Sequence, residues 1–545
     1  MGARASVERV EDIPSSKPIE EVNYMQEQRA IIDSDEPSIK VIARAGTGKT
    51  TTLVGYACAR PKKRMLYLAF NKAIQAEASG KFPSNVTCQT THAVAYRATE
   101  AGRRFNSNGR TISAGLKPFD LSTPFGAPYT DAASAIKILN HFIVSADDAI
   151  SEMHAINVGI NPSLRDRAVE LAREAWRSMI SASPRVPMIH DGYLKLFQLS
   201  GSPIGVFDTV LFDEIQDANP VTTAIVNGTK AGKVFVGDKH QSIYAFRGAK
   251  NAMDQMTSIK EYPLNSSFRF GQELADAANV VLKHTLGETG ELLVGLGAKS
   301  FIGDESHALG YKATIAKITR TNGLIFEMAS ECIRDGTPFH IIGGPESLKI
   351  SLVMDVFKLY DGRRSEIGNP QIKQFASFDE FIRLSEESED VEYKSIGKAI
   401  KSMGSKTPAI IDALRHQCLP STSGASMIFS TAHKSKGLEF DSVQLMDDFV
   451  SLTEKSQEDD GVDIQEGNLI YVAMTRAKRN LFLNADLKSF VKSPSTNIRL
   501  FEDPSKAGNV ASNSVSEFSK AGNNVRGGIG PSKTPGLQPF NPGRC

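Results

Sequence analysis

The stretch ARAGTGKT, residues 43–50, has the residue types and spacing of a phosphate-binding loop. It meets the pattern G-x-x-x-x-G-K-[ST], with Ala43 in place of the first glycine. Gly46 and Gly48 allow the backbone N–H groups to point at phosphate oxygens. Lys49 supplies charge for the β- and γ-phosphates, and the Thr50 hydroxyl is a ligand for Mg²⁺. Because an expected strand precedes the loop and an expected helix follows it, the stretch predicts binding of a nucleoside triphosphate.

A second group of chemistry-bearing residues lies in TVLFDEIQDANP, residues 209–220, where an apolar run ends in acids. In an open parallel sheet, ligands bind just beyond the carboxyl ends of the strands. With a phosphate-binding loop upstream, we expect Asp213 to hold Mg²⁺ and Glu214 to orient or deprotonate the attacking water. The alternative is a strand that runs into an acid-capped helix. The pair favours hydrolysis of a nucleoside triphosphate that is bound with Mg²⁺.

The composition restricts the class of protein. The chain of 545 residues has 63 basic and 62 acidic residues, which excludes a uniformly basic polyanion binder but allows a local basic groove. Five scattered cysteines without C-x-x-C spacing argue against a zinc or iron–sulfur site and fit a reducing compartment. We expect no membrane span, because no apolar run is long enough. The opening MGARAS fits a loose myristoylation pattern, which we interpret as chance.

The elements that must position these residues follow an alternating pattern of short apolar runs and helical stretches, which predicts an α/β fold. The first set of strands is interrupted by a helical stretch, and a second set by a polar, mostly helical one. We expect two α/β cores, each with its own insertion. The predicted strands of the first set are 39–43, 65–70, 86–90, 206–212 and 233–237; those of the second are 262–264, 316–319, 339–342, 427–431 and 481–484.

The same pattern gives the expected domain boundaries. The two cores are each split by an insertion, and we expect a flexible segment at the start and a disordered, Gly-, Ser- and Asn-rich tail at the end. The expected segments are 1–20 (flexible), 21–96 and 188–262 (first core), 97–187 (helical insertion), 263–344 and 426–500 (second core), 345–425 (short insertion) and 501–545 (tail).

Several further stretches, in order, resemble the motifs of superfamily 1 helicases of the UvrD/Rep/PcrA type. VLFDEIQD and VFVGDKHQSIYAFRGA resemble motifs II and III, and YMQEQRAII resembles the glutamine motif. LYLAFNKAIQAEA, TTHAVAYRA, LNSSFRF, STAHKSKGLEFDSV and EGNLIYVAMTRAK resemble motif Ia, the motif after it, and motifs IV, V and VI. Together they cover roughly residues 22–490. The resemblance implies two RecA-like parallel-sheet P-loop cores that close on ATP.

The resemblance also implies roles for residues of the ATP site. Gln28 would read adenine, with Gln26 as the alternative, and Phe268 would stack on the base. Gln241 would sense the γ-phosphate, and Glu439 would contact the ribose or phosphate region. Arg269 and Arg476 would be arginine fingers supplied by the second core, completing the catalytic set with Glu214. The loop contributes Ala43, Arg44, Ala45, Gly46, Thr47, Gly48, Lys49, Thr50 and Thr51.

For the strand-binding channel, the resemblance implies a further set of residues. The aromatic residues Phe70, Tyr244 and Phe246 are candidates for stacking on DNA bases, which is worth about 1–3 kcal/mol per base. The alternative for each of them is ordinary core packing. The implied DNA contacts are Phe70, Thr91, His92, Tyr244, Phe246, Arg320, Asn322, Thr431 and His433. Two positions depart from the family pattern: Thr51 stands where an arginine is common, and Phe246 where a tryptophan is common.

The stretches LAFNKAI, MIHDGYLKLFQL and EGNLIYVAMTRAK resemble the F-box DNA helicase group within that family. Only about 20 residues precede the glutamine motif, so we expect no F-box and carry over no ubiquitin-ligase role. The roles of His190 and Asp191 stay open, and a lone His–Asp pair is more often structural.

The implied function is an ATP-dependent 3′→5′ single-stranded DNA translocase and helicase in repair, recombination or replication. The alternatives are an RNA-acting motor of the same fold, and a remodeller that strips recombinase filaments from single-stranded DNA. Implied partners are single-stranded DNA, duplex junctions, and a recombinase or single-strand-binding protein. The implied location is the bacterial or phage-infected cytoplasm at the nucleoid, or the eukaryotic nucleus.

Overall fold

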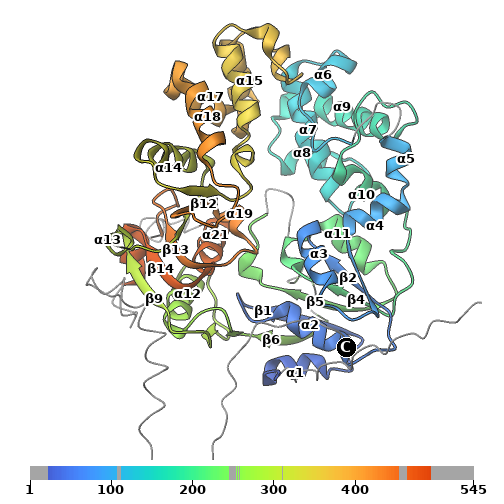
Figure 1. Cartoon of the computed structure of the whole chain (residues 1–545). Coiled ribbons are helices and arrows are strands. Elements are labelled where there is room, and N and C mark those ends of the chain that lie inside the picture. The colour runs from blue at the N-terminus through green and yellow to red at the C-terminus, as the bar shows by residue number, and fades with distance from the viewer. Residues whose placement is uncertain are drawn as a thin grey trace, which may run out of the picture.

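The computed structural model describes residues 23–106, 112–244, 253, 256, 258–309, 311–388, 390–452 and 463–492. Two α/β cores lie side by side, and each carries a helical insertion on the same side of the molecule (Figure 1). The expected flexible start, the MGARAS stretch, Phe246 and the tail lie outside the described residues. Within the described ranges, no helix is both long and apolar enough to cross a membrane.

The first core is a parallel six-stranded sheet in the order β3-β2-β4-β5-β1-β6. Its central strands are buried on both faces, which explains their nearly continuous apolar sequences. The strands are β1 Ser38–Ala43, β2 Met65–Ala69, β3 Val86–Thr90, β4 Thr209–Phe212, β5 Gly232–Gly237 and β6 Lys260–Leu264.

Helices cover both faces of this sheet. Alternate residues of the central strands β2, β4 and β5 pack into two separate apolar clusters, one on either side. On one face lie α1 Gln26–Ile32, α2 Lys49–Cys58 and α3 Lys72–Ser79; on the other lie α4 Thr91–Ala98, α10 His190–Leu199 and α11 Pro220–Asn227. Two short 3₁₀ turns, η1 Ile215–Asp217 and η2 Lys239–Gln241, follow β4 and β5. These turns place polar residues at the carboxyl edge of the sheet.

The second core is also a parallel six-stranded sheet, in the order β11-β12-β10-β13-β14-β9. Its strands are β9 Phe301–Asp304, β10 Ile315–Thr319, β11 Phe339–Ile341, β12 Met427–Thr431, β13 Phe440–Leu445 and β14 Ala477–Leu483. Its helices are α12 Gln272–His284, α13 Glu305–Leu309, α14 Asn322–Asp335, α19 Ala432–Ser435, α21 Ile464–Met474 and α22 Ala485–Val491. A small pair, β7 Ser266–Ser267 and β8 Val294–Gly295, lies near the first core.

One predicted strand belongs to the other core. The run 262–264 was expected to open the second set, but β6 pairs with β1 in the first sheet, with Tyr262 beside Val41. The first sheet therefore extends through Leu264. The expected strand 206–212 begins only at Thr209, and β9 and β13 were not predicted. Pairing of an edge strand is a tertiary choice that the local sequence does not encode.

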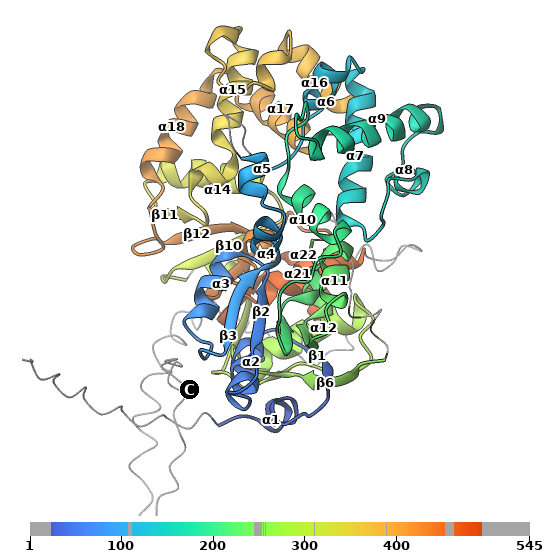
Figure 2. The same ribbon diagram turned by 90° about the vertical axis from the view of Figure 1, so that its right-hand side faces the viewer.

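The two insertions are helical, as predicted. The first contains α5 Ala101–Phe105, α6 Phe119–Phe125, α7 Tyr129–Val144, α8 Glu152–Asn157 and α9 Pro162–Ile180. The second contains α15 Ile350–Tyr360, α16 Phe378–Glu387, α17 Val391–Met403 and α18 Thr407–Gln417. Figure 2 shows them side by side above the cores.

The insertions touch one another. The ring of Phe375, fully buried in the second insertion, packs edge-on against Phe119 and Tyr129 of the first, with centroids 5.3 and 6.0 Å away. Around these rings, Lys117 pairs with Asp390 at 3.3 Å. The molecule is therefore joined both between its cores and between its insertions.

Candidate active site

The phosphate-binding loop joins β1 to the N-terminus of α2, as predicted. Gly46 and Gly48 both have a φ of +75°, a left-handed conformation that side chains with a Cβ rarely adopt. A Cβ on Gly46 would lie 2.7 Å from the Cβ of Arg269, so glycine also permits the close approach of the second core. Because the first N–H groups of a helix have no intrahelical partner, the start of α2 is suited to a phosphate.

The two predicted acids lie directly after β4, facing the loop. Asp213 is buried; its carboxylate accepts hydrogen bonds from the Glu214 amide at 2.9 Å and from the Tyr67 hydroxyl at 2.8 Å. Glu214 has a φ of +53°, an unusual conformation for a residue with a side chain. Its carboxylate forms an ion pair with Lys49 at 2.7 Å and accepts from the side chain of Gln216. The loop lysine and the expected base are therefore paired with each other.

The environment gives the two acids different protonation behaviour. Burial, reinforced by the Glu214 charge, raises the pKa of Asp213 to about 6. Burial acts in the same direction on Glu214, but the charges of Lys49 and Lys436 outweigh it and lower its pKa to about 2. Glu214 is thus ionised at neutral pH, while the Asp213 carboxylate has few favourable charges around it. A buried carboxylate in that condition is suited to a cation.

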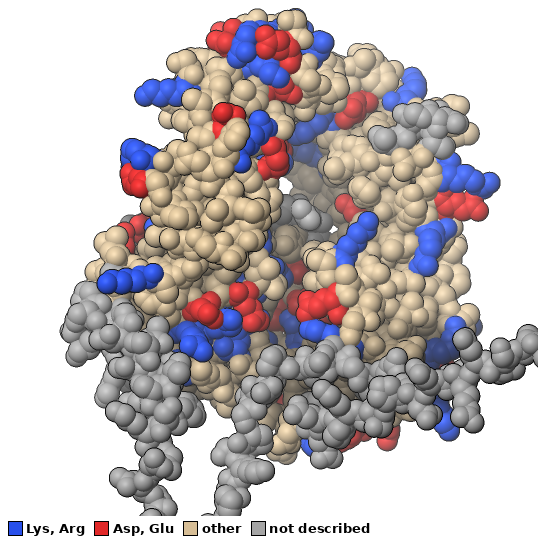
Figure 3. Space-filling view, in the orientation of Figure 1, with Lys and Arg blue, Asp and Glu red and all other residues tan. Residues whose placement is uncertain are grey.

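Residues of both cores line one cavity of about 340 Å³ between them. The first core contributes the loop, Asp213, Glu214 and Gln241; the second contributes the two predicted arginines and Glu439. The full lining is Gly46, Thr47, Gly48, Lys49, Thr50, Thr51, Tyr67, Phe70, Asn71, Ile74, Glu77, Ala78, Lys81, Asp213, Glu214, Asp217, Gln241, Tyr244, Arg269, Lys436, Gly437, Glu439 and Arg476. In the space-filling view, a hollow lies between the two halves of the molecule, and charged side chains of both signs gather at its lower end (Figure 3).

The two arginines are held differently. Arg269 pairs with Glu439 at 2.7 Å and donates to the backbone oxygen of Thr475. Arg476 is almost fully buried, and its guanidinium donates to the backbone oxygens of Val472 and Leu438. Burial, and then the nearby charge of Arg269, lower the pKa of Arg476. Two cations close together at one end of a cavity form an environment for an anion that accumulates charge.

Lys436, a lysine to which the sequence motifs gave no role, joins the cores across the cavity. Lys436 of the second core forms an ion pair with the buried Asp217 and donates to the backbone oxygen of Gln241 at 2.5 Å. The Gln241 side chain in turn donates to Asp238 at 2.8 Å. Lys436 stands within the stretch STAHKSKGLEFDSV, so the motif contained the signal. The role of Tyr67 as a partner of Asp213 could not be predicted, because a tyrosine in a buried strand is expected to pack in the core.

At the opposite side of the loop, Gln28 and Phe268 flank Gly48. A Cβ on Gly48 would lie 3.0 Å from the Gln28 amide nitrogen and 3.7 Å from the Phe268 ring. Gln28 is buried and donates to the Thr52 hydroxyl at 3.2 Å, whereas Gln26 is exposed. Of the two glutamines, Gln28 is the one that the structure brings to the loop. Thr51 is half-buried in the first turn of α2.

The expected DNA contacts are more dispersed, and several have partners within the protein. The rings of Phe70 and Tyr244 stack on each other, 5.5 Å apart, and both line the same cavity as the loop. The Tyr244 hydroxyl donates to the backbone oxygen of His433. Arg320 pairs through two nitrogens with Glu466 at 2.9–3.1 Å.

Four other expected contacts lie at helix starts. Thr91 is buried at the start of α4, and the neighbouring His92 pairs with Asp191 of α10 at 2.9 Å. Thr431 caps α19, and Asn322 accepts from Lys434 at 3.1 Å. Asp191, of the adjacent pair His190 and Asp191, thus has His92 as its partner in the structure. Phe246 lies outside the described residues.

Comparisons with known proteins agree with this architecture. Residues 205–260 match the model of the UvrD/REP helicase N-terminal domain, and residues 303–487 that of the UvrD-like helicase C-terminal domain. The chain is 30% identical to F-box DNA helicase 1 of Gallus gallus over 513 residues, which is 87% of the chain and 50% of the relative.

Two further relatives extend over most of the chain. F-box DNA helicase protein 1 of Schizosaccharomyces pombe is 30% identical, over 88% of the chain and 59% of the relative. Gabija protein GajB of Bacillus cereus is 23% identical, over 85% of the chain and 96% of the relative. The chain thus spans half to three-fifths of the length of the two F-box helicases that it matches. With two RecA-like cores and UvrD-type sequence in both, the chain is a relative of the UvrD/Rep-type helicases.

Proposed function

We propose that the chain is an ATP-dependent DNA helicase that moves along single-stranded DNA in the 3′→5′ direction. The observation that carries the proposal is the shared cavity, in which the phosphate-binding loop and the acids of one core face two arginines of the other. A site built from two bodies is complete only when both bodies are closed on the nucleotide. Opening and closing can therefore be coupled to stepping along a strand.

The residues present fit a magnesium ion bound with ATP. The Thr50 hydroxyl and the Asp213 carboxylate would hold the ion, which neutralises charge on the phosphates. No group of three or more His, Cys, Asp or Glu side chains forms a metal site among the described residues, so phosphates and water would complete its coordination. Lys49 would leave Glu214 for the phosphates and free that carboxylate to orient water.

Single-stranded DNA and duplex junctions are the proposed substrates, in repair, recombination or replication. The support is the similarity to DNA helicases over most of the chain. A recombinase or a single-strand-binding protein is the proposed protein partner, and the nucleoid or the nucleus is the proposed location.

The test is strand displacement on matched DNA and RNA duplexes that carry either a 3′ or a 5′ single-stranded tail. We expect ATP-dependent unwinding of the 3′-tailed DNA duplex. Unwinding of the RNA duplex alone would indicate an RNA motor. ATP-driven removal of a recombinase from single-stranded DNA without unwinding would indicate a remodeller. Absence of strand-stimulated ATP hydrolysis would refute a motor of any kind.

A further inference from the structure

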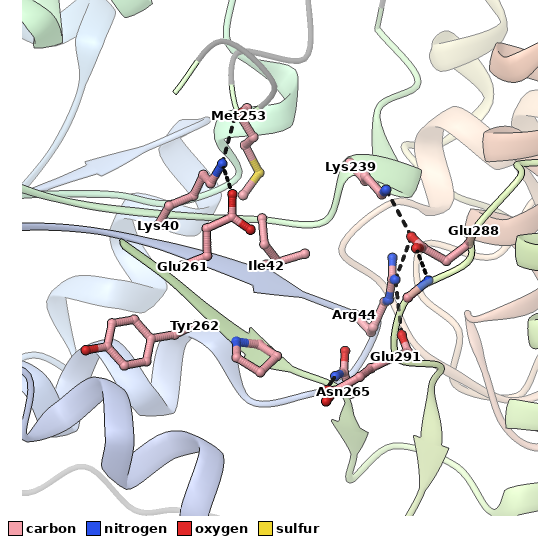
Figure 4. A pocket seen from close by; sticks show the side chains of 12 residues that line it. Lys40, Ile42, Arg44, Lys239, Met253, Glu261, Tyr262, Asn265, Glu288 and Glu291 are labelled. Carbon is pink, nitrogen blue, oxygen red and sulfur yellow. Dashed lines mark hydrogen bonds and ion pairs between the residues drawn. The ribbon is translucent and has the colours of Figure 1, made fainter. Parts of the chain in front are cut away.

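A buried cluster of charges lies behind the phosphate-binding loop, outside the cavity just described, with Glu288 at its centre (Figure 4). The Glu288 carboxylate pairs with Arg44 at 2.7 Å, with Lys239 at 3.0 Å and with His240 at 2.9 Å. Its second oxygen accepts from the Gly290 amide at 2.9 Å. One carboxylate therefore contacts three basic side chains.

These contacts join the two cores. Arg44 belongs to the phosphate-binding loop, and Lys239 and His240 directly precede Gln241 in η2. Glu288 follows α12 of the second core. A second tie lies beside it: the Tyr471 hydroxyl of α21 accepts from the Ala45 amide at 3.3 Å and donates to Asp238 at 3.2 Å. The loop and the segment of the γ-phosphate sensor are both fixed to the second core from behind.

The carboxylates that act on Arg44 and His240 are Glu288, which pairs with both, and the buried Asp238. Arg44 is 3% exposed, and its Nε and one terminal nitrogen have no hydrogen-bond partner. Among the residues that the structure describes, Glu288 is the one carboxylate within ion-pair distance of Arg44. Burial disfavours the Glu288 charge, but hydrogen bonds from His240 and Arg44 outweigh burial and hold its pKa well below its usual range. Removing one member of a buried pair leaves an uncompensated charge, so this contact resists opening.

The front and rear contacts between the cores differ in what surrounds them. At the front, Lys436 reaches Asp217 across the cavity that ATP would enter, so nucleotide exchange has to disturb this contact. The pocket at the rear, about 330 Å³, is lined by other residues and shares none with the front cavity. The Glu288 cluster can therefore stay closed while the front opens.

We propose that Glu288 is a positioning residue, the pivot on which the second core turns when it closes on the nucleotide and brings its arginines to the phosphates. This inference rests on the proposed function. It adds that Glu288 couples closure of the second core on the nucleotide to the position of Gln241. Because His240 and Gln241 are adjacent in one turn, a shift of the second core at Glu288 moves the backbone that carries the γ-phosphate sensor. Strand binding would act on hydrolysis through this contact.

The experiment compares Glu288→Gln with Glu291→Gln. Glu291 lines the same pocket, but its carboxylate accepts from the Asn265 amide at 2.6 Å and has no ion pair with a described residue. ATP hydrolysis is measured with and without single-stranded DNA, together with the KM for ATP. We expect Glu288→Gln to keep its KM within about threefold and to lose tenfold or more of the stimulation by DNA. Glu291→Gln should retain the wild-type stimulation.

A second readout separates coupling from loss of stability. Fluorophores on the two cores should report closure by a non-hydrolysable ATP analogue in the wild type and a smaller change in Glu288→Gln. If Glu288→Gln does not fold, Glu288→Asp carries the same test, because it keeps the negative charge while the shorter side chain lengthens the contacts to Arg44, Lys239 and His240. Wild-type stimulation and closure in the variant would overturn the pivot and leave the proposed function intact. A wild-type protein without strand-stimulated hydrolysis would overturn both.

Discussion

Replacing Glu214 by Gln should make the protein bind ATP more tightly and hydrolyse it far more slowly. The expectation of slow hydrolysis follows from the role of a base. The expectation of tighter binding comes from the structure, where Glu214 pairs with Lys49 at 2.7 Å. The nucleotide has to break this pair before Lys49 can reach its phosphates. Gln removes the charge and keeps the shape of the side chain.

The magnitudes follow from the pKa of Glu214, which is lowered from 4.5 to about 2. Each unit of pKa corresponds to about 1.4 kcal/mol, so the surrounding charges favour the carboxylate by about 3 kcal/mol. Burial acts against the charge, so this value is the net preference for the carboxylate; Lys49 supplies only part of the attraction, because Lys436 also contributes and the side chain is 19% exposed. We expect ATP affinity to rise by about tenfold and kcat to fall by about 10²–10⁴.

The assay combines phosphate release with binding of a fluorescent ATP analogue in the presence of Mg²⁺. Glu77→Gln is the matched control, because Glu77 lines the same cavity but pairs with Lys81. The control should leave kcat and affinity near those of the wild type. A Glu214→Gln variant with kcat within threefold of the wild type would refute the role of base. Unchanged or weaker ATP binding would refute the idea that the Lys49 pair opposes the nucleotide.

Three further outcomes are expected. Arg476→Lys should bind ATP within a few-fold of wild type but lose about 10³ or more in DNA-stimulated kcat, because lysine cannot form the planar fork of a guanidinium. The measurement is ATP hydrolysis as a function of strand concentration. Full stimulation by DNA in this variant would show that another residue is the arginine finger. Burial raises the pKa of the Asp213 carboxyl to about 6, and this group must lose its proton to hold Mg²⁺. The apparent Mg²⁺ affinity should therefore fall by about tenfold per pH unit below pH 6 and stay level above pH 7. An affinity for Mg²⁺ that does not change with pH would exclude Asp213 as the ligand. Phe375→Ala should lower folding stability by about 3–5 kcal/mol and speed limited proteolysis of the insertions, because its ring packs both within the second insertion and against the first, whereas truncating the exposed Tyr360 should not.

Much of the fold could be predicted because apolar runs and motif order are local features of the sequence. The strand β13, Phe440–Leu445, was missed for a physical reason. Its residues Ser442 and Gln444 are polar but buried, and Ser442 exchanges hydrogen bonds with Tyr311 and Asn480 at 2.9 Å. Polar groups satisfied by neighbouring elements do not appear as an apolar run. The placement of β6 at the edge of the first sheet was missed for a similar reason, because it depends on pairing.

The site shows the same division. The loop, the acids and the arginines carry their chemistry in their residue types, and the sequence predicted each of them. Their pairing in the folded chain depends on distances between segments far apart in sequence, as between Arg44 and Glu288 or between Asp217 and Lys436. Spacing alone could not show that Gln28 is buried against the loop while Gln26 is exposed.

The charged groups of the cavity are already paired with one another, and this pairing bears on how closure is controlled. Lys49 is held by Glu214, Arg269 by Glu439, and Lys436 by Asp217. A bound triphosphate can replace the carboxylate partners of Lys49 and Arg269, and a metal ion can compensate Asp213. Each exchange releases an acid of one core and fixes a base of the same core on the ligand. The free energy of nucleotide binding is thereby spent on rearranging the contacts at the front of the cleft, where the two cores must move. The rear contact at Glu288 offers no such exchange, since its three bases face a carboxylate outside that cavity. With exchangeable contacts at the front and the proposed pivot at Glu288, closure would take the form of a rotation about the loop, and this rotation would carry the second core along a strand.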